Sequence, residues 1–271
     1  MDRDLLSEGA TRLIAFAVVL LALVLWERWA ALRRQQVRRA PRWRTNLGMG
    51  AIDALILRIA WPAGAVGAAF LAESRGWGAL NAWPMPAAME VAAAVLLLDL
   101  VIYLQHWAFH AAPWLWRIHR VHDADPEVDV STALRFHPVE SALSMVLKIG
   151  VVLLFGLPPL GVLVFEIVLN AAAMFNHTNA SLPGGLERRI RRVLVTPDMH
   201  RIHHSTQGAE SYSNFGFSLS WWDRLFRTYR AAPRIAQASM PIGLPDAPAS
   251  PAHYRLGAAL LMPFRPARRR S

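Results

Sequence analysis

Apolar and polar residues alternate along the chain in long blocks, and four apolar blocks can enter a bilayer. They cover residues 13–26, 47–72, 86–104 and 142–175. A membrane-spanning helix needs about 20 mainly apolar residues. The pattern therefore predicts an all-α, integral-membrane bundle of four to five spans or half-spans. Leu157-Pro158-Pro159 interrupts the last block, and because proline breaks helices, this block is expected to form a hairpin.

Arginines are unevenly distributed between the connections that join these blocks. The connection after block 47–72 carries only Arg75, whereas the preceding connection carries seven arginines. These seven are Arg28, Arg33, Arg34, Arg38, Arg39, Arg42 and Arg44. Basic loops remain in the cytoplasm, which predicts a cytoplasmic position for this loop, for the polar regions 106–140 and 176–229, and for the basic end at Arg268 to Arg270. The N-terminus would then lie outside.

Composition supports a membrane protein and removes several classes of site. The 271 residues are 54% hydrophobic and 18% charged, with a net charge of +10 and no cysteine, and the mean hydropathy is +0.26. Without cysteine there can be no disulfide framework, thiolate zinc site, iron–sulfur cluster or cysteine nucleophile. Because the arginines flank apolar blocks, they indicate a membrane surface and not a nucleic-acid partner. The excess of arginine over lysine, of which Lys148 is the only one, together with abundant alanine, indicates a GC-rich bacterial genome. The expected location is therefore a bacterial inner membrane.

Histidines are concentrated in the two polar regions. Nine of the ten lie there, in three spaced groups and two single positions. The groups are His106 with His110, His119 with His122 and Asp123, and His200 with His203 and His204; the single positions are His137 and His177. Residues three or four apart share one helix face, so the members of each group can converge. The pattern predicts a metal site on the cytoplasmic side of the membrane.

The number of imidazoles indicates two metal ions, because one tetrahedral or octahedral ion cannot accept eight or nine of them. Imidazole suits Fe, Zn, Cu and Ni, and the lack of sulfur ligands argues against Cu(I) and blue-copper sites. Spacing alone leaves iron and zinc open. A di-zinc hydrolase would usually add several carboxylates, and only Asp123 and Asp198 are candidates.

Several other polar residues are candidates for orienting the ligating imidazoles. Asp99 and Tyr103 share a helix stripe with His106 and His110, and a carboxylate inside a span needs a partner. Either side chain could accept or share the outer N–H of a ligand. The remaining candidates are Asn176, Asn179, Asp198, Asn214 and Asp223.

Three further expectations concern charged and tail residues. Asp125, Glu127 and Asp129 are expected on a solvated face. Lys148 and Glu166 lie on opposite arms of the hairpin and are expected to pair inside the bundle. The Pro/Ala-rich segment 231–252 is expected to extend over the surface, with His253 as a surface residue.

The pattern resembles the fatty acid hydroxylase / sterol desaturase superfamily over residues 99–229. The matching stretches are HWAFH, HRVHDADPEVDVSTALRFHP, FNHTN, TPDMHRIHHS and SNFGFSLSWWDRLFRTY. Two positions depart from the family pattern, which usually has a second histidine at Asp123 and a glycine at Arg227. Asp123 could still ligate iron, making one ion more anionic.

The resemblance implies a membrane bundle with a cytoplasmic helical cap that holds a non-haem di-iron site. It implies an O₂-dependent oxidoreductase that hydroxylates or desaturates a lipid C–H bond, with a separate electron donor of cytochrome or ferredoxin type and its reductase. The expected parts are transmembrane helices in residues 1–105, a histidine-rich catalytic region in 106–230 and a basic tail in 231–271. The expected ligands are His106, His110, His119, His122, Asp123, His137, His177, His200, His203 and His204.

Three alternatives stay open at this point. A di-zinc membrane hydrolase would use a metal-bound hydroxide. A b-type cytochrome would place paired histidines deep in facing spans, whereas these histidines follow the span ends. A metal sensor or transporter would need a path of ionisable residues through the membrane, and those in the apolar blocks are few and scattered.

Overall fold

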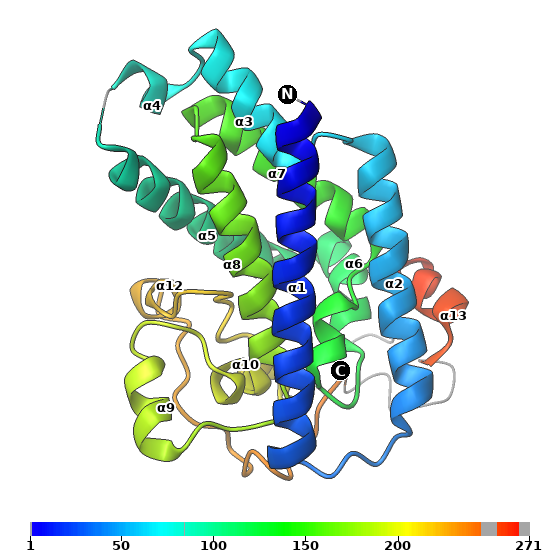
Figure 1. The fold of residues 1–271 in the computed structure, drawn as a ribbon. Helices are drawn as coiled ribbons and strands as arrows, with labels where there is room; N and C mark the ends of the chain where they lie inside the picture. The colour runs from blue at the N-terminus through cyan, green and yellow to red at the C-terminus, as the bar shows by residue number, and fades with distance from the viewer. Residues whose placement is uncertain (1, 84, 245–253, 266–271) are drawn as a thin grey trace.

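The chain folds as a bundle of long helices with a cap of short helices and loops at one end (Figure 1). The computed structural model describes residues 2–83, 85–244 and 254–265. Within these residues there is no strand, only bridges between single residue pairs. The predicted all-α class is confirmed.

The long helices follow the apolar blocks. They are α1 (Asp2–Ala30), α2 (Arg39–Ala60), α3 (Gly64–Arg75), α5 (Ala87–Ala111), α7 (Pro138–Phe155) and α8 (Pro159–His177). The short elements are α4 (Ala79–Ala82), α6 (Pro113–Asp123), η1 (Val130–Leu134), α9 (Gly184–Ile190), α10 (Pro197–His203), α11 (Gly208–Ser211), α12 (Trp221–Leu225), α13 (Leu256–Leu260) and η3 (Met262–Phe264).

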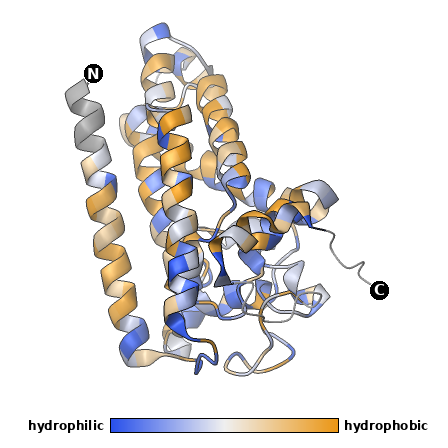
Figure 2. Cartoon of the chain, turned by 90° about the vertical axis from the view of Figure 1, so that its right-hand side faces the viewer, coloured by the Kyte–Doolittle hydropathy of each residue, from blue (hydrophilic) through white to orange (hydrophobic). Residues whose placement is uncertain are grey.

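Five helical stretches of the described chain are long and apolar enough to cross a membrane. They are Gly9–Ala30, Arg39–Ala82, Ala87–Ala111, Pro138–Phe155 and Pro159–His177. The outward-facing residues of α1 remain exposed and apolar, such as Leu13 and Val18. Figure 2 shows apolar colour along the long helices and polar colour toward the cap. Exposed apolar faces on helices of this length belong to an integral membrane protein.

The predicted hairpin is confirmed, and its turn depends on glycine and proline. Helix α7 ends at Phe155, the next residue, Gly156, has a left-handed φ of 66°, and α8 begins at Pro159. A Cβ at Gly156 would lie 2.3 Å from the carbonyl oxygen of Trp77. Only glycine fits here because both the backbone conformation and the neighbouring chain exclude a side chain.

The ends of five long helices meet at the cap. In Figure 1 the last turns of α1, α5 and α8 and the first turns of α2 and α7 point toward the same end, whereas α3 and α4 lie at the other. The arginine-rich connection between α1 and α2 therefore lies at the cap end, and Arg75 at the far end. The two connections thus lie at opposite ends of the bundle.

The expectation that the tail lies over the surface fits residues 231–239, which are exposed or half-buried, but was wrong for the stretch that follows them. Met240 is fully buried, and Ile242 and Leu244 are nearly so. Met240 and Ile242 form an apolar cluster with Val128. The loop after α6 and the tail bury these apolar side chains against each other. Residues 245–252, His253 and Arg268 to Arg270 lie outside the described residues.

Candidate metal centre

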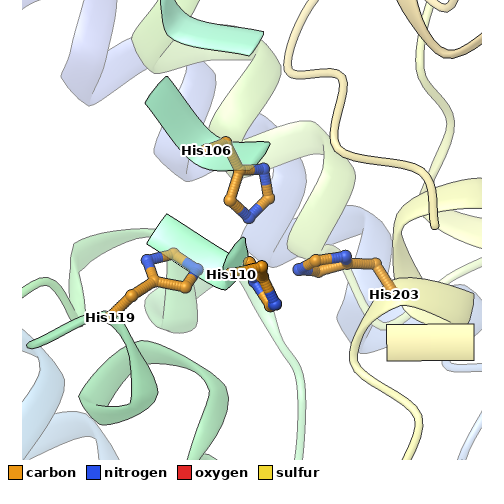
Figure 3. A group of neighbouring side chains, drawn as sticks. All are labelled: His106, His110, His119 and His203. Atoms are coloured by element: carbon orange, nitrogen blue, oxygen red, sulfur yellow. The ribbon is translucent and has the colours of Figure 1, made fainter. Parts of the chain in front are cut away.

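Eight buried histidines form two groups of four at the junction of the bundle and the cap. The first quartet is His106, His110, His119 and His203; the second quartet is His122, His177, His200 and His204. Within each quartet, one ring nitrogen from every member lies within 4.8 Å of the others. Figure 3 shows the first quartet with its rings turned toward a common centre.

Each quartet is assembled across several elements. Helix α5 supplies His106 and His110 to the first quartet, and α8 supplies His177 to the second. Helix α6 and the α10 segment each supply residues to both quartets. Residues three apart on a helix point about 60° apart around its axis, so one helix can serve two neighbouring centres.

The expected convergence of His119 and His122 was therefore wrong, whereas Asp123 does lie beside His119, with Oδ1 3.7 Å from Nε2. His119 belongs to the first quartet and His122 to the second. The same division separates His203 from His200 and His204.

The second quartet is compact. The Nε2 atom of His177 lies 3.0 Å from that of His122, 3.1 Å from that of His200 and 3.2 Å from that of His204. The Nε2 atoms of His200 and His204 are also 3.2 Å apart. Four nitrogens at this separation surround a point about 2 Å from each, the length of an imidazole bond to a divalent metal.

Hydrogen bonds on the outer ring nitrogens fix several of the rings. His106 Nδ1 lies 2.8 Å from the carbonyl oxygen of Phe215, and His203 Nδ1 lies 2.8 Å from that of Ser213. His177 Nδ1 lies 2.6 Å from the carbonyl oxygen of Ala173. A carbonyl oxygen only accepts, so each Nδ1 carries the proton and each Nε2 presents a lone pair to its quartet.

Glu140 is a site residue that the sequence reasoning missed. Its Oε1 lies 2.7 Å from His119 Nδ1 and accepts the outer N–H of that ring. The carboxylate is buried in the first turn of α7. A carboxylate at the start of an apolar helix is costly without a partner, and that signal was present in the sequence.

Burial keeps most of the cap histidines neutral. It lowers the pKa of His203 to about 3. Burial, and next the neighbouring imidazoles, hold the pKa values of His122, His200 and His204 well below the usual range. Burial also acts to lower the pKa of His119, but the carboxylates of Glu140 and Asp123 outweigh it and raise the value. Neutral imidazole is the form that binds a metal.

The residues fit two metal ions. Several inward nitrogens of the first quartet have no hydrogen-bond partner: Nε2 of His106, His110, His119 and His203. Buried polar atoms without partners cost free energy, and in the second quartet the Nε2 lone pairs face one another. A divalent cation at each centre would satisfy both sets of nitrogens.

Asp123 lies between the quartets. Its Oδ2 is 3.5 Å from His110 Nε2, and its Oδ1 is 3.7 Å both from His119 Nε2 and from His204 Nδ1. The carboxylate therefore lies near histidines of both quartets. It also borders a small cavity that reaches Ser205 and Gly243.

His137 does not join either quartet. Its Nδ1 accepts the backbone N–H of Val139 at the start of α7, and its Nε2 lies 3.1 Å from the carbonyl oxygen of Leu260. Both ring nitrogens are used in holding α7 and α13, so the expectation that His137 completes the metal site does not fit this placement. The position before a proline at a helix start explains the capping role.

Four of the polar candidates hold the loop 213–229 and not an imidazole. Asp99 accepts the backbone N–H groups of Ser218 and Leu219 and the indole N–H of Trp222. The expected bond from Asp99 or Tyr103 to a ligating histidine is replaced by these loop bonds, since the loop lies over this face of α5. The other three pair as follows: Tyr103 with Thr228, Asn176 with the Phe217 carbonyl, and Asp223 with the N–H groups of Phe215 and Gly216.

The remaining three candidates hold other parts of the cap. Asn214 donates to the carbonyl oxygens of Met199 and Arg230. Asn179 exchanges hydrogen bonds with the backbone of Arg33. Asp198 accepts from Arg201.

The expected solvated face at Asp125, Glu127 and Asp129 was wrong, because all three are buried. Arg42 of α2, itself fully buried, donates to Asp125 from Nε at 2.7 Å and to Asp129 from Nη1 at 2.8 Å. A buried carboxylate requires such a partner. Arg42 therefore ties the bundle to the loop that follows His122.

The expected pair of Lys148 and Glu166 is confirmed at 3.3 Å. Arg12 of α1 also binds Glu166, so three helices share this buried carboxylate.

Arg227, where the resembling family usually has glycine, adopts a φ of 61°. That left-handed conformation favours glycine, which explains the family preference. The loop closes nonetheless, with the N–H groups of Thr228 and Tyr229 donating to the carbonyl oxygen of Asp223.

Comparison with known proteins agrees with this architecture. The profile of the fatty acid hydroxylase family matches residues 91–228. The chain is 29% identical over 160 residues to ornithine lipid hydroxylase OlsE of Rhizobium tropici, covering 59% of this chain and 47% of that protein. It is 29% identical over 136 residues to alkylglycerol monooxygenase of Caenorhabditis elegans, covering 49% and 25%. It is 31% identical over 137 residues to that of Danio rerio, covering 50% and 29%.

The matched segment spans less than half the length of each of these curated relatives. No solved structure matches the chain. The family match covers half of the chain and includes both ends of the histidine-bearing region. The chain therefore belongs to the fatty acid hydroxylase family.

Proposed function

We propose that the protein is a membrane oxygenase that uses two iron ions to hydroxylate a C–H bond of a lipid. The observation that carries this proposal is the pair of buried histidine quartets at the junction of the helical bundle and the cap, in a chain of this family. When bound, the iron pair would supply the oxidising power: O₂, two electrons and two protons place one oxygen atom in the C–H bond and release the other as water. An alkyl chain offers no group for acid–base attack, so such power is required.

The proposed ligands are the eight quartet histidines, with Asp123 as a further ligand of the first site. Its Oδ2 lies 3.5 Å from His110 Nε2 and its Oδ1 lies 3.7 Å from His119 Nε2, and both nitrogens face that site. Toward the second quartet, Asp123 lies 3.7 Å from the outer Nδ1 of His204, where its charge supports that ring without ligating the second ion. His137 is not part of the proposed set.

The surrounding residues hold the ligands in place and exclude water. Glu140 and the carbonyl oxygens of Ser213 and Phe215 accept the outer N–H groups of first-quartet rings. These bonds orient the rings and raise their basicity. All eight histidines are 3% exposed or less, so bulk water does not compete for the site.

The membrane supplies the substrate in this proposal. Lipid is the substrate class, since relatives are named for an ornithine lipid and an alkylglycerol. Electrons would come from a separate donor of cytochrome or ferredoxin type with its reductase. The arginine-rich connection at the cap end supports a cytoplasmic metal site in a bacterial inner membrane.

Lipid analysis under ¹⁸O₂ tests the proposal. Membranes with the chain should contain one lipid class heavier by a single ¹⁸O atom, and membranes with His110→Ala should not. The purified protein should hold two iron ions. Loss of two hydrogens without ¹⁸O would indicate desaturation, and two zinc ions with O₂-independent turnover would favour the di-zinc hydrolase.

A further inference from the structure

Two phenylalanine rings bridge the quartets, because each contacts one histidine of the first and one of the second. Phe136 follows η1, and Phe217 lies in the loop 213–229. The centroid distances are 6.4 Å from Phe136 to His119 and 4.3 Å to His122, and 5.2 Å from Phe217 to His106 and 6.2 Å to His200.

The same two rings join the apolar core of the bundle. Phe217 is a buried member of the largest apolar cluster, which also contains Phe165 and Met174 of α8, and Phe136 packs against that cluster. The hydrocarbon interior of the bundle therefore reaches the metal centre through these two side chains.

Other aromatic rings at the site contact one quartet only. Phe215 contacts three histidines, all of the first quartet. Phe109 contacts His119, again of the first quartet. Among the phenylalanines of the described residues that contact the quartets, only Phe136 and Phe217 contact both.

The cavity on the cap side has a different character. It is small and is bordered by Asp123, Ser205 and Ser211, by His203 and His204, and by Trp116 and Leu244. An alkyl chain there would cover the polar groups without hydrogen-bonding them, which costs free energy. The cavity is also too small for an alkyl chain, whereas a saturated chain is favoured against the phenylalanine rings.

We propose that Phe136 and Phe217 form a phenylalanine wall against which the alkyl chain of the substrate lies, and that their size sets which carbon reaches the metal pair. This inference rests on the proposed function and adds its specificity determinants. A smaller side chain lets the alkyl chain advance past the wall, and a larger one holds it back.

The position of the oxygen label tests the wall. Membranes containing wild type, Phe217→Leu, Phe217→Trp or Phe136→Leu are labelled with ¹⁸O₂, and the labelled carbon is located by tandem mass spectrometry of the host lipids. Phe217→Leu and Phe217→Trp should move the label by one or more carbons in opposite directions. Phe109→Leu, which alters a ring near His119 only, should reduce yield at most and leave the position unchanged.

A second measurement does not depend on turnover. With p-benzoylphenylalanine in place of Phe217, irradiation of the membranes should attach a lipid to the chain, and the same probe in place of Phe109 should not. Iron content equal to wild type shows that the variants fold. Labelled product at an unchanged carbon, with no adduct at position 217, would overturn the wall. Adducts without labelled product would instead overturn the proposed oxygenation and leave the wall standing.

Discussion

The two quartets are held by different means. Three rings of the first quartet are hydrogen-bonded to other parts of the fold: His119 to Glu140, and His106 and His203 to loop carbonyls. In the second quartet, His177 bonds within its own helix and His122 stacks on Phe136.

The outer Nδ1 atoms of His122, His200 and His204 have no hydrogen-bond partner. The first centre therefore depends on the carboxylate of Glu140 and on loop carbonyls, and the second on close packing. The histidine motifs supply ligands to both centres, but the hydrogen bonds that orient the rings are concentrated at the first centre. Each centre should respond to its own set of substitutions.

Removing a ligand should have the largest effect. His110→Ala in the first quartet and His204→Ala in the second should each lower the metal content from about two ions per chain to about one. Turnover should fall more than 100-fold in both, because loss of a ligand exceeds the 10–100-fold cost of losing a partner of a ligand. Metal analysis of the purified proteins checks this, and two retained ions in either variant would contradict the assignment.

Glu140→Gln should separate the centres. The amide can accept the outer N–H of His119 only through a neutral hydrogen bond, so metal affinity at the first quartet should fall about 10–100-fold. The second quartet should keep its affinity. Chelator titration should show two release phases, with only one shifted.

Glu187→Gln is the matched control for that variant. Glu187 is also a buried carboxylate, but it pairs with Arg191 and Thr196 in the cap and contacts no histidine of either quartet through the bonds described. Its loss should lower stability without moving either release phase. Equal shifts of both phases in Glu140→Gln would refute the division into two differently supported centres.

Asp123→Asn should affect both centres together, since its carboxylate lies near His110, His119 and His204. We expect each phase of the chelator titration to shift about 10-fold. Asp123→His, which introduces the residue usual in the family, should keep two ions. A shift confined to one phase would place Asp123 in one centre only.

The sequence was sufficient for the elements and the ligand types but not for their partition. Apolar length predicted the spans, and Pro158 predicted the hairpin, because both are local properties. His119 and His122 belong to different quartets because of the way α6 packs against α5 and α10. The spacing of residues within one helix does not predict that packing.

Buried charges show the same limit. The sequence predicted a solvated face at Asp125 and Asp129 because their partner, Arg42, is more than 80 positions earlier in the chain. Glu140 was missed although its apolar surroundings were visible, since its partner His119 lies 21 residues away. His137 was grouped with ligands by residue type, whereas its place before Pro138 makes it a helix cap.

Asp223→Asn should weaken the first centre through its loop. Asp223 accepts the N–H groups of Phe215 and Gly216 at 2.8 and 2.9 Å, and the loop carries the carbonyl that orients His106. Loss of these charge-assisted bonds should cost about 1–3 kcal/mol of stability and shift the first release phase by less than Glu140→Gln does. Thermal unfolding and chelator titration together check this; a shift of the second phase alone would contradict it.

Arg227→Gly should give the smallest effect and the opposite sign. Arg227 is exposed and has a φ of 61°, a conformation that costs a non-glycine residue about 1 kcal/mol. Glycine removes that strain but loses more entropy on folding, so the net gain should be no more than about 0.5–1 kcal/mol. Arg192→Gly is the matched control, because Arg192 is also exposed but does not share the positive φ of Arg227, and it should lower the unfolding temperature. If Arg227→Gly lowers it as well, the left-handed turn after α12 is supported by the arginine side chain and not strained by it.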